Sequence, residues 1–328
     1  MSLLQVKNLV VEFPGRHGTL RALDDISFAI APGEILGIVG ESGAGKSLTS
    51  AAIIGLLESP GRISGGEILL EGERIDNLNE AQMRRIRGKR IGAIFQDPLT
   101  SLNPLYTVGR QLIETIQTHL PVNAQEARRR AIALLQETGI AAAEQRMEHY
   151  PHQFSGGMRQ RVVIALALAG EPKLIVADEP TTALDVSIQA QIITLLKSVC
   201  KKHGAAVMLI THDMGVIAET CDRVAVMYAG RIAEIGPVHD VINYPSHPYT
   251  EGLMAAIPDI AVDRERLNQI DGAMPRLNAI PTGCAFNPRC TKVFDRCRQN
   301  RPDLMTAQAT QAACWLLAPH AAHAGVTA

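Results

Sequence analysis

Gly40-Glu41-Ser42-Gly43-Ala44-Gly45-Lys46-Ser47 is the stretch from which the fold of this chain can be inferred. It follows the apolar run Ile35–Val39, which predicts a buried strand, and precedes Leu48–Leu56, which predicts a helix. A glycine-rich loop between a strand and a helix turns backbone N–H groups and the helix N-terminus toward a polyphosphate. The stretch therefore predicts a P-loop that binds a nucleoside triphosphate. Lys46 would reach the β- and γ-phosphates, and the Ser47 hydroxyl would bind Mg²⁺.

Length and composition limit the classes of protein to consider. The 328 residues, 46% of them hydrophobic, suffice for one large α/β domain and an appendage. The formal net charge is −1 and the pI is near 6.8, so no overall positive field attracts nucleic acid. The local cluster 128–130, three arginines, is typical of the solvated face of a helix. We expect no nucleic-acid partner.

No apolar run reaches the roughly 18 residues that a membrane-spanning helix requires. Met1–Leu4 lead directly into strand-like sequence, so we expect no signal peptide and a protein that stays where it is made. Any association with a membrane is expected to go through a partner protein.

The segment before the P-loop is rich in β-structure. Leu4–Phe13 and Ala22–Ile30 alternate as strands do, with a turn at 14–18 between them. Phe13, near the tip of this hairpin, has two interpretations: an exposed ring that stacks on adenine or a core phenylalanine. After the P-loop helix, Ile68–Gly72 predicts another strand and turn.

A helical insertion is predicted next. Ile91–Phe95 is expected to be a buried strand that ends at Gln96, followed by irregular structure over Asp97–Pro104, which contains two prolines. From about 108 to 146 the apolar spacing is helical, and Ala124–Gly139 ends on a glycine at the position of a C-cap.

Two further stretches point to phosphate chemistry. In Phe154–Gln160, Ser155 is a plausible N-cap, and the glycines after it leave the first N–H groups of a helix open to an anion. Leu174–Glu179 is a buried strand with two carboxylates at its end. Asp178 suits the Mg²⁺ shell, and Glu179 could polarise a water against the γ-phosphate. The strand Val207–Thr211 then leads to His212 at the same edge of the sheet.

Together these motifs resemble the nucleotide-binding subunits of ABC transporters, over roughly 3–258. The resemblance identifies Gln96 as the Q-loop glutamine and Phe154–Gln160 as the signature motif, with Phe154 where leucine is commoner. Ala183-Leu184-Asp185 is similar to the D-loop. By this resemblance the catalytic residues are Lys46, Gln96, Glu179 and His212, and the Mg²⁺ ligands are Ser47, Gln96 and Asp178. The nucleotide-binding residues it implies are Phe13, Gly40, Glu41, Ser42, Gly43, Ala44, Gly45, Lys46, Ser47, Leu48, Gln96, Ser155, Gly156, Gly157, Gln160, Asp178 and Asp185.

The resemblance also implies partners. In this family two ATPase domains close head to tail, so that ATP is shared between the P-loop of one and the signature helix of the other. We expect two membrane-spanning permease subunits, a second and similar ATPase subunit, and indirectly a substrate-binding protein. Loop 96–104 and the helical insertion would pass the ATP-driven change to the permease. The chain would be peripheral to the cytoplasmic face of the inner membrane.

The segment after 258 is rich in proline and holds four of the six cysteines, Cys284, Cys290, Cys297 and Cys314, spaced C-x5-C-x6-C-x16-C. Disulfides are disfavoured without export, and zinc sites usually show closer C-x2–4-C pairs. An iron–sulfur cluster tolerates wider gaps, so it ranks first, ahead of zinc and free thiols. The tail resembles that of oligopeptide and dipeptide importer ATPases, which implies a [4Fe-4S] cluster. Its expected role is to staple a small appendage.

The expected fold is therefore an α/β P-loop NTPase of the ABC type. It would have an antiparallel β subdomain, a helical insertion at about 97–160, an ATPase domain at 1–258 and the cysteine-containing appendage at 259–328. The expected function is ATP hydrolysis that energises uptake of di- and oligopeptides. The alternatives are a soluble ABC ATPase of DNA repair or translation, a P-loop kinase or GTPase, and an importer of nickel or glutathione.

Overall fold

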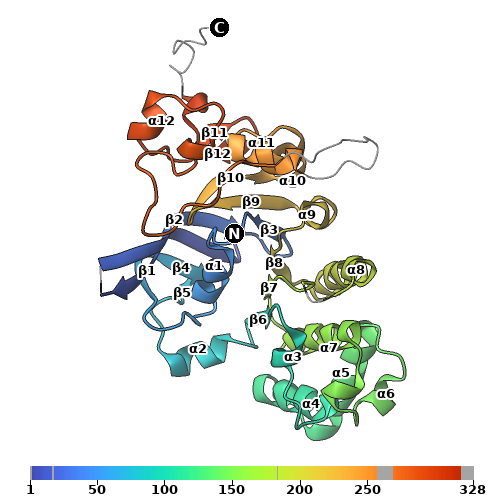
Figure 1. The fold of residues 1–328 in the computed structure, drawn as a ribbon. Helices are drawn as coiled ribbons and strands as arrows, with labels where there is room; N and C mark the ends of the chain where they lie inside the picture. The colour runs from blue at the N-terminus through green and yellow to red at the C-terminus, as the bar shows by residue number, and fades with distance from the viewer. Residues whose placement is uncertain (1, 17, 183, 257–268, 319–328) are drawn as a thin grey trace. The chain divides into compact units, whose positions relative to one another are not determined.

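The computed structural model describes residues 2–16, 18–182, 184–256 and 269–318 (Figure 1). These residues form two compact units. The first unit contains residues 1–5, 29–35 and 69–211, and the second contains residues 6–28, 36–68 and 212–328. The domain boundary predicted at 258 lies outside the described residues.

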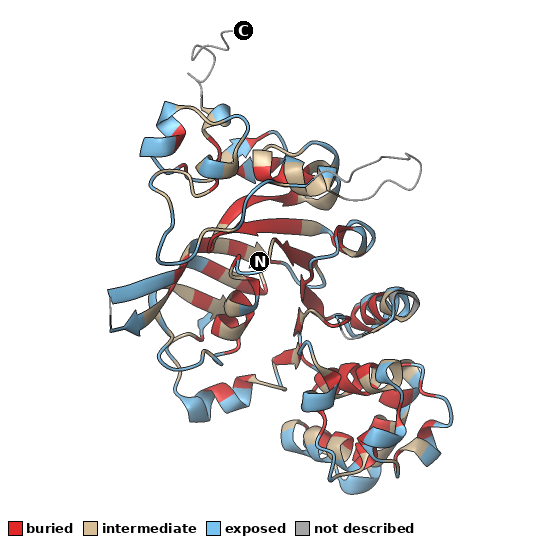
Figure 2. Ribbon diagram, viewed as in Figure 1, coloured by how far each residue is buried: buried red, intermediate tan, exposed pale blue. Residues whose placement is uncertain are grey.

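A parallel sheet of order β8-β7-β6 forms the core of the first unit. Residues 91–94 of β6 pair with 174–177 of β7, and 174–178 of β7 pair with 206–210 of β8. All five residues of β8 are buried, as Figure 2 shows by their colour, because a strand covered on both faces needs apolar side chains throughout. The bounds of the strands in this unit are Glu73–Arg74 (β5), Ile91–Ile94 (β6), Leu174–Asp178 (β7) and Ala206–Ile210 (β8).

The predicted helical insertion is confirmed. Helices α4 and α5 pack against each other and against α7, and each begins at a side-chain cap, Thr107 for α4 and Asn123 for α5. Gly139 follows the end of α5 with a φ of 74°, as a C-terminal glycine does. The helices of this unit are Glu80–Ile86 (α2), Pro98–Ser101 (α3), Val108–His119 (α4), Ala124–Glu137 (α5), Ala143–Arg146 (α6), Pro151–Gln153 (η1, 3₁₀), Gly156–Leu168 (α7) and Val186–His203 (α8).

Two details near Gln96 differ from the sequence-based expectation. Strand β6 ends at Ile94, and Phe95 is 44% exposed, so the buried strand is one residue shorter than predicted. The segment expected to be irregular contains helix α3, since Pro98 occupies its first turn, where proline is favoured, and Asp97 accepts the N–H of Leu99 at 2.8 Å. The two prolines of this segment suggested irregular structure, but the first of them, Pro98, starts a helix.

The second unit contains a sheet run of order β11-β12-β10-β9-β3. Strand β3 is parallel to β9, and β10 is antiparallel to both β9 and β12. The C-terminal appendage therefore adds two strands to the sheet that carries the P-loop. The strands of this run are Ile35–Val39 (β3), Arg223–Tyr228 (β9), Arg231–Pro237 (β10), Met305–Ala307 (β11) and Thr310–Ala312 (β12).

The predicted β-rich entry is an antiparallel sheet of order β2-β1-β4-β5. Its first strands are longer than the alternating segments in the sequence because the turn between them is tighter than expected. The bounds are Leu4–Gly15 (β1), Gly18–Ile30 (β2) and Arg62–Leu70 (β4). The helices of the second unit are Lys46–Ile53 (α1), Met214–Thr220 (α9), Val238–Asn243 (α10), Pro248–Ala255 (α11), Asn287–Arg289 (η2, 3₁₀), Asp295–Gln299 (α12) and Trp315–Leu317 (η3, 3₁₀).

A buried carboxylate joins the appendage to the rest of the second unit. Glu234 on β10 is 0% exposed. Its oxygens accept the N–H of Ser246 at 2.9 Å, the N–H of His247 at 3.0 Å and the hydroxyl of Thr310 on β12 at 3.3 Å. One side chain thus satisfies donors from two segments, 246–247 and β12, that are distant from each other in the sequence, which is how a buried carboxylate is tolerated.

We expect Glu234→Ala to lower the free energy of unfolding of this unit by about 3 kcal/mol, because it leaves these buried donors without an acceptor. The measurement is the urea midpoint followed by emission of Trp315, the only tryptophan of the chain, which lies in the appendage. Glu251→Ala is the control, since Glu251 is 53% exposed and pairs with Lys292 at the surface. Equal midpoints for the two variants would contradict the prediction.

Candidate functional site

The P-loop begins directly after β3 and ends in the first turn of α1. Lys46 is 7% exposed, and its ammonium donates to the carbonyls of Gly40 at 2.8 Å and Glu41 at 3.1 Å. The lysine therefore lies along the inside of the loop. A charged group held among backbone carbonyls at a helix N-terminus is well placed to bind an anion.

Three glycines of the loop, Gly40, Gly43 and Gly45, have backbone angles that favour glycine. Gly43 has a φ of 83° and Gly45 a φ of 104°, and a Cβ added to Gly45 would lie 2.6 Å from the side chain of Leu23. No side chain of the described residues caps α1, and its first turn contains no acidic residue. The N–H end of α1 is thus kept clear of competing carboxylates.

Glu41 is held from two sides by residues that the sequence did not suggest. Its N–H donates to the hydroxyl of Tyr249 on α11 at 2.9 Å, and its carboxylate pairs with Arg289 of the appendage at 3.0 and 3.1 Å. These partners are 208 and 248 positions away along the chain, so no local pattern connects them with the P-loop.

Phe13 and His212 also belong to the second unit. Phe13 is half-buried, and its ring lies so close to Gly61 that a Cβ there would meet it at 2.7 Å. This placement leaves part of the ring accessible, which is compatible with stacking. His212 is exposed and directly precedes Asp213, whose carboxylate caps α9 by accepting two N–H groups. Both assignments to the nucleotide site remain predictions.

In the first unit, the strand-end carboxylates lie as expected. Asp178 ends β7, and Glu179 follows in a left-handed conformation with a φ of 46°. This conformation costs a non-glycine residue energy and is common at functional sites. The Glu179 carboxylate accepts hydrogen bonds from Gln96 at 3.2 Å and from the hydroxyl of Thr182 at 2.7 Å. The structure thus joins two predicted residues, Gln96 and Glu179, and adds Thr182, which sequence reasoning missed.

The predicted signature segment forms the start of α7. Ser155 is exposed and caps the helix by accepting the N–H of Met158 at 3.3 Å, while Gly156 is exposed beside it. Phe154, in place of the commoner leucine, is 3% exposed and packs inward. Gln160 is fully buried, and both polar atoms of its side chain have no hydrogen-bond partner among the described residues.

The D-loop is described in part. Ala183 lies outside the described residues, whereas Asp185 is exposed at the start of α8. Its role stays a prediction, as do those of Ser42, Ala44, Ser47, Leu48 and Gly157. Of these, Ser42 and Ser47 are exposed on the P-loop.

The residues present fit ATP and Mg²⁺. The second unit supplies a glycine-rich loop, a buried lysine ammonium and an open helix N-terminus, which is the donor set for a polyphosphate. The first unit supplies carboxylate oxygens at a strand end, the ligand type that Mg²⁺ prefers.

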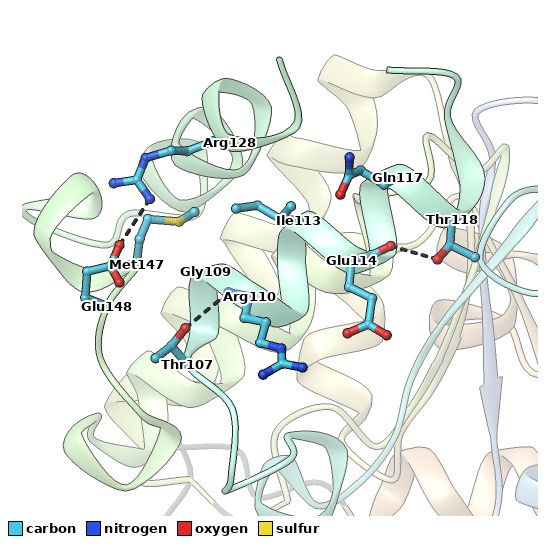
Figure 3. Close-up of a pocket in the computed structure, with 10 residues that line it drawn as sticks. All are labelled: Thr107, Gly109, Arg110, Ile113, Glu114, Gln117, Thr118, Arg128, Met147 and Glu148. Carbon is cyan, nitrogen blue, oxygen red and sulfur yellow. Dashed lines mark hydrogen bonds and ion pairs between the residues drawn. The ribbon is translucent and has the colours of Figure 1, made fainter. Parts of the chain in front are cut away.

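The helical insertion has a cavity of about 550 Å³ of its own (Figure 3). Arg110 and Ile113 of α4 line one side, and an ion pair of 3.1 Å joins Arg128 of α5 to Glu148 on the other. None of the predicted ATP-binding residues lines it. It is a mixed polar and apolar hollow on a part of the fold that the nucleotide motifs do not use.

The expectation of an iron–sulfur cluster, or of zinc, at the four cysteines is not supported. Cys284, Cys290, Cys297 and Cys314 do line one cavity, but it measures only about 20 Å³, room for about one water molecule. In the described part of the chain, no group of three or more His, Cys, Asp or Glu side chains is arranged to hold a metal ion. The prediction of a metal centre was therefore wrong.

Three of these thiols lie in a largely desolvated setting. Burial raises the pKa of Cys284 and of Cys314 to about 11, and burial also raises the pKa of Cys290. Metal ligation requires thiolates, and an apolar setting favours the neutral thiol. The cysteines act here as small apolar residues that pack the appendage, which the spacing alone could not distinguish from ligands.

None of the helices in the described ranges combines the length and apolar character needed to cross a membrane.

Comparisons with known proteins agree with this geometry. Residues 23–182 match the model of the family "ABC transporter", and residues 233–297 match "Oligopeptide/dipeptide transporter, C-terminal region". The oligopeptide transport ATP-binding protein AppD of Bacillus subtilis is 48% identical over 93% of both chains. The dipeptide transport ATP-binding protein DppD of Escherichia coli is 47% identical over 96% of both. Both relatives carry the names of transport ATP-binding proteins.

Among solved structures, a dimeric, post-hydrolysis form of the ATP-binding cassette MJ0796 bound to ADP and Pi is similar. Its TM-score is 0.64 at 30% sequence identity, and the match covers 72% of this chain and 98% of that one. The resemblance thus extends to the fold as well as to the motifs.

Proposed function

Because this chain belongs to the family of ABC transporter ATP-binding subunits with an oligopeptide/dipeptide transporter C-terminal region, we propose that it hydrolyses ATP to energise import of short peptides. The observation that carries this function is the presence, in one chain, of the P-loop of α1 and of that C-terminal region at 233–297. The P-loop indicates the energy source, and the C-terminal region indicates the class of cargo.

Each group of residues has a distinct task. When bound, ATP supplies the transferable γ-phosphate and Mg²⁺ neutralises its charge. Lys46 and the N–H groups of the loop bind the phosphates, and Asp178 with Ser47 holds the metal. Glu179 holds and orients the attacking water and takes its proton, and Gln96, which donates to Glu179 at 3.2 Å, orients this carboxylate.

The partners follow from the family. The chain works with membrane-spanning permease subunits and with a second ATPase subunit, and it associates with the membrane through them. We place it on the cytoplasmic face of the inner membrane, with Ser155, Gly156 and Gly157 completing the ATP site of the other ATPase subunit. A substrate-binding protein would deliver the peptide to the permease.

Two alternative functions, a soluble ABC ATPase and a P-loop kinase or GTPase, explain fewer features of this chain. A soluble ABC ATPase of DNA repair or translation would not need the C-terminal region at 233–297, and a kinase or GTPase would not need the segment Phe154–Gln160. Neither would share 47% identity with a dipeptide transport protein over nearly its whole length.

The experiment is peptide uptake by vesicles that contain the permease subunits, the ATPase pair and external binding protein. We expect uptake of labelled di- and oligopeptides to require internal ATP and this chain. ATP hydrolysis with uptake of nickel or glutathione, but not of peptides, would contradict the proposed cargo and would still support the ATPase activity.

We infer that the permease contacts the segment after Gln96. Leu99 on α3 and Leu105 after it are 61% and 79% exposed, which is unusual for two large apolar side chains so close in sequence. We assign the permease as the partner of these two leucines. The segment that carries them begins at Gln96, whose side chain donates to Glu179, so a contact here would connect the permease with the hydrolysis site.

We expect Leu105→Asp to reduce co-purification with the permease about tenfold or more, because a charge would replace an apolar contact worth about 2 kcal/mol. ATP affinity of the isolated chain is expected to stay unchanged. Leu316→Asp, at a leucine 41% exposed on the appendage, is the matched control. Equal retention of the permease by both variants would place the contact elsewhere.

A further inference from the structure

Glu41 joins the P-loop to two residues in the C-terminal part of the chain, Tyr249 and Arg289. Its backbone N–H donates to the hydroxyl of Tyr249 on α11, at 2.9 Å. Its carboxylate accepts from one guanidinium nitrogen of Arg289, at 3.0 and 3.1 Å. The adjacent carbonyls of Gly40 and Glu41 accept from Lys46, so the anchored peptide is the one that also holds this lysine.

The two anchoring side chains are themselves rigid. Tyr249 is 0% exposed, and its ring packs against Tyr228 at 4.7 Å and against Phe286 of the appendage at 5.4 Å between centroids. The Arg289 side chain is 6% exposed. Its guanidinium also donates to the carbonyls of Asp271 at 2.8 Å and Ile270 at 3.2 Å.

Such an arrangement fixes the start of the loop. The Glu41 N–H is committed to Tyr249 and so is directed away from the anion that the later N–H groups would bind. Charge-assisted bonds made by a buried arginine are stronger than neutral ones and lose little entropy when both ends are already ordered. A loop held in its binding conformation before the ligand arrives binds more tightly, because less ordering remains to be done.

We infer that Arg289 of the appendage and Tyr249 of α11, whose ring packs on Phe286 of the appendage, are positioning residues for the P-loop, through which the appendage raises the affinity of the chain for ATP. The inference rests on the proposed function in one respect, that ATP binds at this loop. Neither residue belongs to an ATP-binding motif, and both act through Glu41. The appendage thereby gains a role in nucleotide binding besides the packing of its own small core.

The test compares Glu41→Gln, Arg289→Met and Tyr249→Phe in the full chain, with the Kd for Mg-ATP measured by calorimetry. We expect each change to raise the Kd about 5- to 10-fold, the effect of one lost hydrogen bond or ion pair. At saturating ATP, the kcat of Arg289→Met and of Tyr249→Phe in the assembled transporter should stay near the wild-type value while KM rises, because only binding is affected.

The direction in which Glu41→Gln changes the Kd for Mg-ATP distinguishes positioning from a simple charge effect. If the two groups acted only through their fields, removing the carboxylate near the phosphates would tighten ATP binding, and removing the guanidinium would weaken it. If the two groups position the loop together, Glu41→Gln and Arg289→Met must each raise the Kd for Mg-ATP. The Kd of the double variant Glu41→Gln/Arg289→Met must then be no higher than that of the single variant with the higher Kd. An unchanged or lower Kd for Glu41→Gln, or additive effects, would overturn the inference.

Matched controls keep folding apart from positioning. Lys292→Met removes a cation of the same appendage that pairs with Glu251, and Tyr244→Phe removes a hydroxyl from a tyrosine that is 67% exposed. Both should leave the Kd unchanged. Emission of Trp315 reports the folding of the appendage. If Arg289→Met alters this emission, the Kd values of Glu41→Gln and Tyr249→Phe test the inference in its place. Failure of the wild-type chain to bind Mg-ATP would instead overturn the proposed function.

Discussion

Glu179→Gln is expected to lower ATP turnover by about 10²–10³-fold while leaving ATP binding intact, because an amide cannot take a proton from the attacking water. The structure makes this substitution conservative in shape. The oxygen of a glutamine side chain can still accept from Gln96 and from Thr182, as the carboxylate does at 3.2 and 2.7 Å. The measurement is phosphate release by the assembled transporter, together with retention of ATP by the paired subunits.

Glu171→Gln is the matched control. Glu171 lies in the same unit and also has a left-handed backbone, with a φ of 56°, but its carboxylate pairs with Arg130 at the surface. We expect it to hydrolyse ATP at the wild-type rate. If Glu179→Gln did so as well, the proton-transfer role would belong to another group.

Lys46→Ala is expected to weaken ATP binding about 100-fold or more, since it removes the buried cation of the P-loop. The ammonium is held at 2.8 and 3.1 Å from two carbonyls of the loop, so no other described lysine can take its place without a rearrangement. Binding of Mg-ATP by calorimetry measures the loss directly.

Lys202→Ala serves as the comparison for this prediction. Its side chain is 62% exposed and pairs with Glu137, so its removal should leave ATP binding unchanged. A Kd for Lys46→Ala within threefold of wild type, a difference of about 0.65 kcal/mol, would show that the phosphates bind elsewhere.

The sequence was most informative where the chemistry is local. The P-loop, its buried strand and its helix were predictable because eight consecutive residues and both flanks form a single pattern. The strand-end pair of Asp178 and Glu179 was recognisable for the same reason. Helix α3 was missed because proline interrupts a helix in its interior and starts one at its first turn, and the sequence alone did not distinguish these positions.

Contacts made over long separations were beyond prediction. Nothing near Glu41 indicates that Tyr249 and Arg289 will hold it, because the tertiary fold alone brings them together. The cysteines show the opposite error. Their spacing suggested ligands, whereas the cavity that they line is too small for a cluster, and burial raises the pKa of Cys284 and Cys314.

The pairing of β12 with β10 has a practical consequence for anyone who shortens this protein. A chain cut after the ATPase motifs would lose the partner of residues 234 and 235, and the backbone donors and acceptors of β10 would become an open edge. Open edges recruit strands from other molecules and promote aggregation. The isolated cassette is therefore expected to precipitate unless its tail is kept or a polar substitute covers that edge.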